Sequence, residues 1–234
     1  MLEYLNLEKG TITFIGAGGK TSLMFFAAKE LKKSKRSVLV TTTTKIYFPN
    51  FGEFDYYFNI KYFEPKDFYG RITVVGKYIN EEGKIIGLNE EEIFSIAKNF
   101  DFILVEGDGA KNLPIKAPLE NEPVIPSFSD VVMGVIGIDC FNKRISEKTV
   151  FRLERFCQVT NSKKGDIIDE YVISKLINSP LGLFKNSPLS SRKIVGINKV
   201  DTKKRREYAK KIFDLTSFEF MVSSAKKGIF EKWR

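Results

Sequence analysis

The chain has 234 residues, 43% of them hydrophobic, which is enough for a substantial core and argues against a disordered protein. It contains no histidine, which excludes a Ser-His-Asp triad, a histidine general base and histidine metal ligands. The formal net charge of +9 is compatible with a nucleic-acid or membrane surface, but the basic runs at 29–36 and 203–211 lie on expected helices. We interpret them as solvated faces and expect neither nucleic acid nor membrane as a partner.

Three features of the sequence favour a cytoplasmic location. The longest apolar runs, such as residues 131–138, are too short to cross a bilayer. Residues 1–10 lack the basic start and apolar stretch of a signal peptide. Cys140 and Cys157 form no C-x-x-C motif and no disulfide framework. Because the chain has no histidine and only two cysteines, its composition favours oxygen ligands and a hard cation such as Mg²⁺.

The first 88 residues predict two strands, a helix and a hairpin. Residues 11–15 predict a buried strand, and apolar residues at i, i+3, i+4 and i+7 from Met24 predict a helix after it. Residues 37–44 predict a second buried strand. Residues 48–70 are aromatic-rich and irregular, and we interpret them as a well-packed connection. Residues 71–88 hold two apolar runs around the turn NEEG, which predicts a β-hairpin.

The rest of the chain continues the alternation of strands and helices. Asn89 and Glu92 have the spacing of a capping box, so a helix is expected to begin there. Further strands are expected at 102–111, 130–140, 192–201 and 218–228. Residues 146–188 are expected to be helical with loops. One amphipathic face of this region consists of Ile168, Tyr171, Val172 and Leu176. A helix after residue 201 has an apolar face of Ala209, Ile212 and Phe213.

This alternation, with several almost continuously apolar strands, predicts an α/β fold. We expect a three-layer sandwich with a mostly parallel sheet and a small β-hairpin insertion. The sequence has no internal repeat, no low-complexity tract and no clear linker. A single domain over residues 1–234 is therefore expected.

A glycine-rich stretch, GAGGKT at 16–21, joins the first strand to the first helix. Glycines allow backbone amides to approach an anion, and a helix N-terminus follows, so this stretch predicts a phosphate-binding loop (P-loop). Lys20 would reach the β- and γ-phosphates, and the Thr21 hydroxyl would hold Mg²⁺. The loop departs from G-x-x-x-x-G-K-[ST] because Phe14 stands where the first glycine belongs, and a tight turn is the alternative. The residues assigned to it are Gly16, Ala17, Gly18, Gly19, Lys20, Thr21 and Ser22.

An acidic turn follows the strand at 102–106. Glu106 and Asp108 would lie at the carboxyl edge of the sheet, where ligands of open α/β sheets bind. We expect Thr21, Glu106 and Asp108 to hold Mg²⁺, and Lys20, Asp108 and Lys45 to act in hydrolysis. An ordinary acidic β-turn is the alternative. With the phosphate loop, this turn makes the expected fold P-loop NTPase-like.

Two motifs at strand ends point to guanine. Asn198, Lys199 and Asp201 form N-K-x-D, and Ser224, Ala225 and Lys226 form S-A-K one helix later. The Asp201 carboxylate can accept from N1–H and the 2-amino group of guanine, whereas adenine lacks that amino group. The order of the motifs favours GTP, with ATP as the alternative.

Five stretches together resemble the selenium-dependent molybdenum hydroxylase accessory protein family (YqeC-like): TFIGAGGKTSLM, VLVTTTTKIYFP, LVEGDGAKNLPIKAPLENEPVIP, VIGIDC and VGINKVD. They occur in this order over nearly the whole chain. The resemblance implies a P-loop fold and a nucleotide-dependent role in maturing a molybdenum enzyme, with that hydroxylase or its cofactor-insertion machinery as a partner. The chain departs from the family at Gly107 and Asn121, where alanine and histidine are common.

Two rival functions remain open at this stage. A kinase or ligase could use Lys45, Lys111 and Lys116 as a basic pocket for a small anionic substrate, and a nucleotide-gated binding module would need no turnover. Residues 111–126 would be a Pro-stiffened connection or a substrate or partner surface. Cys140 would be a buried inert thiol or a ligand for a soft atom.

Overall fold

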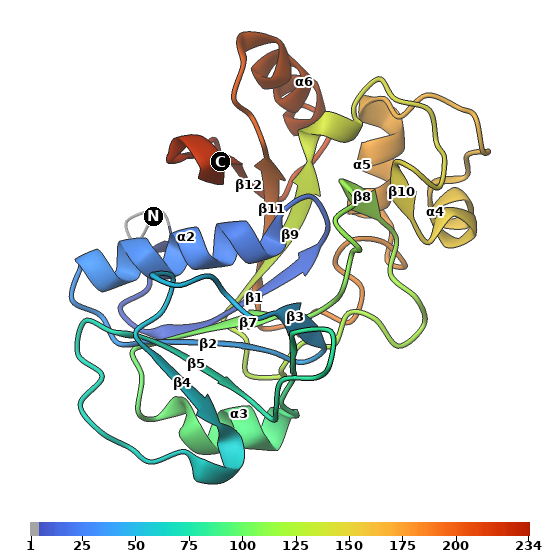
Figure 1. The fold of residues 1–234 in the computed structure, drawn as a ribbon. Coiled ribbons are helices and arrows are strands. Elements are labelled where there is room, and N and C mark those ends of the chain that lie inside the picture. The colour runs from blue at the N-terminus through green and yellow to red at the C-terminus, as the bar shows by residue number, and fades with distance from the viewer. Residues whose placement is uncertain (1–4) are drawn as a thin grey trace.

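The computed structural model describes residues 5–234, in which nine strands form one sheet (Figure 1). Part of the segment expected to lack a signal peptide, residues 1–4, lies outside the described residues. The strand order is β13-β12-β11-β9-β1-β7-β2-β5-β4, and every neighbouring pair is parallel except β12 with β13. The strands are β1 (Gly10–Gly16), β2 (Val38–Thr42), β4 (Tyr56–Asn59), β5 (Ile72–Gly76), β7 (Phe102–Glu106), β9 (Val131–Gly137), β11 (Arg192–Asn198), β12 (Glu219–Ser224) and β13 (Ile229–Lys232).

Helices cover both faces of this sheet, which confirms the predicted three-layer α/β sandwich. On one face, Leu23 and Leu31 of α2 pack with Ile12 and Phe14 of β1. Side chains alternate along a strand, so Ile15 points to the other face and joins the cluster under α5. The helices are α2 (Lys20–Lys33), α3 (Glu90–Ala97), α4 (Leu153–Thr160), α5 (Glu170–Asn178) and α6 (Lys203–Phe213). Three short 3₁₀ helices are η1 (Ile60–Tyr62), η2 (Ile138–Cys140) and η3 (Ala225–Lys227).

Two small sheets join distant parts of the chain near the carboxyl edge of the main sheet. β3 (Lys45–Tyr47), which follows β2, pairs antiparallel with β6 (Lys84–Ile86). β8 (Ile115–Lys116) pairs parallel with β10 (Val150–Phe151). Because β7 and β9 flank β1, the connection that carries β8 has to pass over the carboxyl end of β1.

The expected hairpin over 71–88 is only partly right. Its first half is β5, which lies between β2 and β4 in the main sheet with all five residues buried. The chain folds back only over 77–86, through the bridge between Ile79 and Ile85. A continuously apolar run suits a strand covered on both faces better than an exposed hairpin arm, and this is why β5 lies inside the sheet.

Two strands at the edges of the sheet were not predicted. β4 lies inside residues 48–70, where Tyr56 and Phe58 contact Phe68, so the well-packed connection also contains a strand. β13 follows the correctly expected β12 and turns back antiparallel beside it. Neither β4 nor β13 has a fully buried residue, so neither gives the continuous apolar signal of the central strands.

The local helix signals were largely right. Asn89 and Glu92 form the expected capping box, in which each side chain accepts a hydrogen bond from the other residue's backbone N–H (2.8 and 2.7 Å). Tyr171 is an error in the face assigned to α5, because it is 61% exposed. Its neighbour Val172 is buried, and because consecutive residues on a helix point about 100° apart, Tyr171 points away from the face that Val172 covers.

No helix within residues 5–234 is both long and apolar enough to span a membrane.

Candidate nucleotide site

The glycine-rich loop (residues 16–21) leaves β1 through backbone angles that favour glycine. Gly16, Gly18 and Gly19 have φ values of 91°, 80° and 106°. A Cβ atom on Gly18 would lie 2.0 Å from the backbone nitrogen of Gly137, so a side chain cannot fit there. The sequence therefore needs glycine here for close backbone packing as well as for the turn.

Three backbone amides of this loop are already bonded within the protein. The N–H of Gly16 donates to Asp108 Oδ2 (3.1 Å), that of Ala17 to the Val135 carbonyl (2.8 Å) and that of Gly18 to the Leu113 carbonyl (3.0 Å). The N–H groups of the expected anion cradle that are left to bind an anion are therefore those of Gly19 and of the first turn of α2. Gly19 is the N-cap of that helix and has no side chain to accept these amides.

Lys20 lies buried beneath the loop, with 4% of its surface exposed. Its Nζ donates to the Gly16 carbonyl (2.8 Å) and lies 3.3 Å from Asp108 Oδ1 and 3.7 Å from Glu106 Oε1. Burial works to lower the pKa of Lys20, but Asp108 and Glu106 outweigh it and raise that pKa above its ordinary value. The ammonium group is thus held charged at the point where β1 and β7 end.

The three expected metal ligands lie around this ammonium group. The Thr21 hydroxyl donates to Glu106 Oε2 (2.6 Å), and the buried Oδ1 of Asp108 accepts no hydrogen bond from residues 5–234. Burial raises the pKa of the Glu106 carboxyl, against the opposing effects of Lys20 and Thr21. A hydroxyl and two carboxylates, one with an unsatisfied oxygen, fit Mg²⁺ when phosphate oxygens and water complete its shell. Residues 5–234 contain no group of three or more Asp, Glu, Cys or His that could hold a metal.

A chain of alternating charges continues from Asp108, buried at Lys116 and partly exposed at its far end. Lys116 Nζ lies 3.0 Å from Asp108 Oδ2 and donates to Glu122 Oε2 and the Gly109 carbonyl, both at 2.9 Å. Arg152 in turn donates to Glu122 Oε1 (3.2 Å). The Lys116 side chain is 1% exposed. Residues 111–126 therefore form a cover over the glycine-rich loop. The Leu113 carbonyl joins it to the loop directly, and the pair of Lys116 with Asp108, which accepts from the Gly16 N–H, joins it indirectly.

The N-K-x-D motif touches the other side of the loop. Asn198 is buried at the end of β11, donates from Nδ2 to the Gly18 carbonyl (3.0 Å) and accepts from the Ser223 hydroxyl (3.1 Å). It therefore ties the loop to both β11 and β12. The motifs that the sequence places 180 residues apart are in direct contact.

Lys199 and Asp201 follow Asn198 at a turn. Lys199 has a φ of 65° and pairs with Asp139 (2.8 Å). Asp201 accepts from Arg205 at 2.7 Å, and its other carboxylate oxygen has no hydrogen bond from the described residues. This oxygen, together with the remaining lone pairs of the first, leaves acceptor capacity for a ligand.

Two cavities meet at the glycine-rich loop. The first, here called the base cavity, has a volume of about 500 Å³ and includes Gly19 and Ser22 in its wall. It also contains all six expected base-recognition residues, Asn198, Lys199, Asp201, Ser224, Ala225 and Lys226. The second, here called the basic cavity, has a volume of about 880 Å³ and shares Gly19 with the first. Lys20, Thr21, Glu106 and Lys45 line it.

The expected basic pocket is right in part. Lys45 and Lys111 line the basic cavity, but Lys116 does not, because its ammonium group is buried in the ion pairs described above. Sequence reasoning missed Lys84 and Arg152, which also line this cavity. Both come from the small sheets, whose pairing gave no pattern in the sequence.

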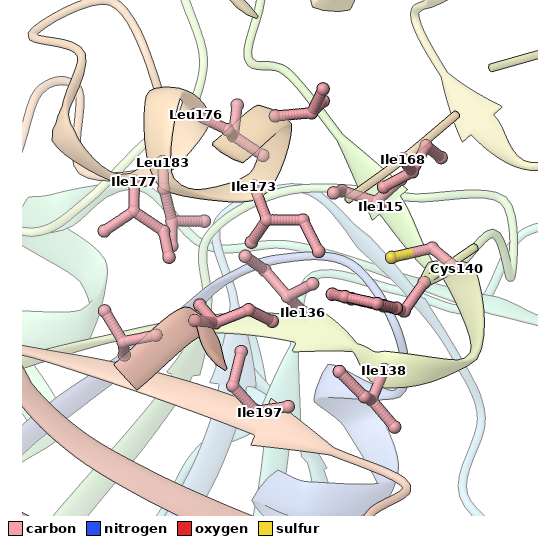
Figure 2. Close-up of a cluster of buried hydrophobic side chains, with 14 of the residues drawn as sticks. Ile115, Ile136, Ile138, Cys140, Ile168, Ile173, Leu176, Ile177, Leu183 and Ile197 are labelled. Carbon is pink, nitrogen blue, oxygen red and sulfur yellow. The ribbon is translucent and has the colours of Figure 1, made fainter. Parts of the chain in front are cut away.

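Cys140 is the buried thiol and not a ligand group. It is fully buried at the end of η2, and Figure 2 shows its side chain among isoleucine and leucine side chains of the cluster under α5. Burial raises the pKa of this thiol well above its ordinary value, with a smaller contribution from Asp139. A thiol that stays protonated in an apolar cluster is neither a nucleophile nor a good metal ligand.

Fold and site together define an α/β protein with a glycine-rich loop, a buried lysine and paired carboxylates at the carboxyl edge of a mostly parallel sheet. The chain belongs to the YqeC protein family, whose model matches residues 12–154. It is 30% identical over 197 residues to the protein described as Uncharacterized protein YqeC from Escherichia coli (strain K12). The aligned region covers 80% of this chain and 75% of that relative. The family expected from the sequence is thereby confirmed. The span that the family model matches, residues 12–154, contains the loop and the acidic turn, whereas Asn198 and Asp201 lie beyond it.

Proposed function

We propose that the chain binds a nucleoside triphosphate together with Mg²⁺, prefers GTP over ATP, and hydrolyses it as a cytoplasmic accessory protein. The client would be a molybdenum or selenium-dependent hydroxylase or its cofactor-insertion machinery. The observation that carries the nucleotide part is the position of Gly19, which lines both cavities. A triphosphate along the first turn of α2 would extend from the base cavity to Lys20. The sequence resemblance described above supports the client part.

Lys20 would carry most of the charge recognition. It now donates to the Gly16 carbonyl, and a γ-phosphate would offer its ammonium group a charged acceptor in place of that neutral one. The first-turn amides of α2 would bind phosphate oxygens without moving. Because Lys20 is already charged and buried, the site needs little reorganisation to receive an anion.

Thr21, Glu106 and Asp108 would hold Mg²⁺, which would supply positive charge to the phosphate oxygens. Asp108 would also orient the attacking water through Oδ1, which lies 3.3 Å from Lys20 Nζ and accepts no hydrogen bond from residues 5–234. Lys45, which also lines the basic cavity, would approach the γ-phosphate. These assignments form a hydrolytic site made of carboxylates, a hydroxyl and lysines, as a chain without histidine requires.

Asp201 would select guanine by accepting from N1–H and from the 2-amino group. The stem of Lys199 would lie along the base while its ammonium group keeps the Asp139 contact, and the Ala225 amide would donate to O6. Asn198 would keep the base motif and the loop in fixed register, because it bonds to the Gly18 carbonyl.

A second candidate function, a kinase or ligase, is favoured by one observation. The basic cavity is larger than the base cavity and lies beside Lys20 and Thr21, where a phosphoryl acceptor would have to sit. Turnover of a small acceptor with consumption of the triphosphate would support this candidate over hydrolysis to free phosphate.

Calorimetry with GTP, ATP and xanthosine triphosphate, each with Mg²⁺, tests the proposal. Asp201→Asn should weaken GTP binding about tenfold and strengthen xanthosine triphosphate binding, because an amide NH₂ opposes the guanine 2-amino group but matches a carbonyl. Lys20→Ala should weaken all three. Lys9→Ala is the matched control, since Lys9 is exposed and precedes β1 at the opposite edge of the sheet. Equal binding of GTP and ATP by the wild type would reject the guanine assignment.

The client part needs a separate experiment. A molybdenum or selenium-dependent hydroxylase purified from cells without this chain should contain less molybdenum or selenium than the same enzyme from cells that have it. Lys20→Ala should fail to restore that content where the wild type does. Unchanged metal and selenium content would reject the accessory role and leave the nucleotide site standing.

A further inference from the structure

The basic cavity carries more positive charge than a nucleotide at the glycine-rich loop would use. Besides Lys20, four cations line it, Lys45, Lys84, Lys111 and Arg152. They come from β3, β6, the turn after β7 and the residue after β10, so four separate segments bring a cation to one hollow. With Lys20, five cations and two carboxylates line the cavity, a net charge of +3, although Lys84 also pairs with Glu82 (2.7 Å), which is outside the lining.

The two carboxylates in the wall already have partners. Glu106 accepts from Thr21, and Glu122 accepts from Lys116, which is buried behind the wall. By contrast, neither Lys45 nor Lys111 forms a salt bridge within residues 5–234. The Nε of Arg152 is buried and has no hydrogen-bond acceptor there either. The cavity therefore offers donors that the protein itself leaves unused.

The backbone in this wall is held in an uncommon conformation. Lys111, Asn112 and Arg152 have φ values of 45°, 61° and 65°, in the left-handed region that few residues other than glycine adopt. Such a conformation is strained and persists where its surroundings fix it, which is frequent at ligand sites. Here the surroundings are the Leu113 carbonyl bond to Gly18 and the pairing of β8 with β10.

Aromatic rings lie beside these cations. The Arg152 guanidinium lies 4.5 Å from the centroid of the Phe151 ring, and Lys111 lies 5.7 Å from the same centroid. In the same way, Lys84 Nζ lies 4.9 Å from the centroid of the Tyr47 ring. Both rings line the cavity, so it combines fixed cations with flat apolar surfaces. Its volume of about 880 Å³ exceeds what one phosphate group requires.

We propose that the basic cavity is a second ligand site, which binds a small phosphorylated molecule with an aromatic or other flat ring at the same time as the nucleotide. Lys111 and Arg152 bind its phosphate together with Lys45, which this ligand shares with the γ-phosphate of the nucleotide, and Tyr47 and Phe151 contact its ring. The simultaneous binding rests on the proposed function, in which the nucleotide extends from the base cavity past Gly19 to Lys20 and does not reach Lys84, Lys111 or Arg152. The cavity itself does not depend on it.

Phenyl phosphate is a suitable probe, since it has one phosphomonoester and one ring. It is titrated by calorimetry into the free protein and into protein saturated with Mg²⁺ and a non-hydrolysable GTP analogue. Binding is expected in both states. Lys45→Ala and Lys111→Ala should each weaken it about tenfold, because each removes a charged hydrogen-bond donor. Inorganic phosphate should bind more weakly than phenyl phosphate. Lys9→Ala should bind the probe as the wild type does.

The outcomes separate this inference from the proposed function. If the analogue binds but phenyl phosphate does not, or if the analogue displaces phenyl phosphate, the second site is refuted and the nucleotide site stands. The same refutation follows if Lys45→Ala and Lys111→Ala bind the probe like Lys9→Ala. If no nucleotide binds but phenyl phosphate binds with the expected dependence on both lysines, the second site stands and the nucleotide proposal fails.

Discussion

Replacing Lys116 by methionine tests how much the buried ion pairs contribute to stability. Methionine keeps an unbranched stem of similar length and removes only the ammonium group and its hydrogen bonds. That group lies within 3.0 Å of Asp108 and within 2.9 Å of Glu122, and its side chain is 1% exposed. The substitution thus leaves two carboxylates without their shared cation, one of them buried.

The expected loss can be worked from these contacts. Removing one partner of a buried ion pair costs about 3–5 kcal/mol, because the remaining charge is left uncompensated. Asp108 keeps Lys20 at 3.3 Å, and Glu122 keeps Arg152 at 3.2 Å. Since each carboxylate retains one cation, we expect the lower end of that range, about 3 kcal/mol.

Urea unfolding followed by the fluorescence of the single tryptophan, Trp233, measures this loss. With a slope of about 3 kcal/mol per M, the midpoint should fall by about 1 M. Lys9→Met is the control and should leave the midpoint unchanged. Combining Lys116→Met with Asp108→Asn should cost at least about 1 kcal/mol less than the two single losses together. A midpoint equal to that of Lys9→Met, or strictly additive losses, would refute the role of the ion pair.

Two other substitutions test the proposed catalytic role of the Asp108 carboxylate and an ion pair far from the site. Asp108→Asn should lower the rate of GTP hydrolysis about 100-fold while changing GTP affinity far less, as stopped-flow and calorimetry would measure; equal losses would indicate a structural role. Burial opposes the shift at Asp55, but the Ile72 amide and Lys32 hold its pKa below the ordinary value. Its stabilisation is therefore complete above the unfolded pKa, about 4, and is lost as pH falls through the folded pKa. Asp55→Asn should flatten the stability curve below about pH 4, and an unchanged acid-unfolding profile would contradict this.

The central strands and the loop could be predicted because their signals are local. β7 and β9 are almost continuously apolar, β1 mixes threonine with isoleucine and phenylalanine, and the left-handed backbone of the turn after β1 favours glycine. The capping box at Asn89 depends only on residues three apart. β4 and β13 were missed because an edge strand is defined by the neighbour that it pairs with, and a local pattern does not show that neighbour.

The walls of the site could be predicted only in part. Lys45 and Lys111 follow strand ends and are visible as candidates, whereas Lys84 and Arg152 reach the cavity through pairings between distant segments. The fate of Lys116 was also hidden, because burial of a lysine depends on Asp108 and Glu122 lying on both sides of it. The spacing of residues in the sequence predicts which of them lie at strand ends. It does not predict which lysine has an exposed ammonium group.

The cover over the glycine-rich loop has a consequence for how this protein can change through evolution or engineering. It touches the loop and β9 through backbone atoms, since the Leu113 and Pro114 carbonyls accept from the Gly18 and Gly137 amides. Substitution of either side chain leaves these bonds in place. Insertion or deletion of a single residue between Gly109 and Leu113 shifts both carbonyls out of register. In this stretch the number of residues should therefore tolerate less change than their identity.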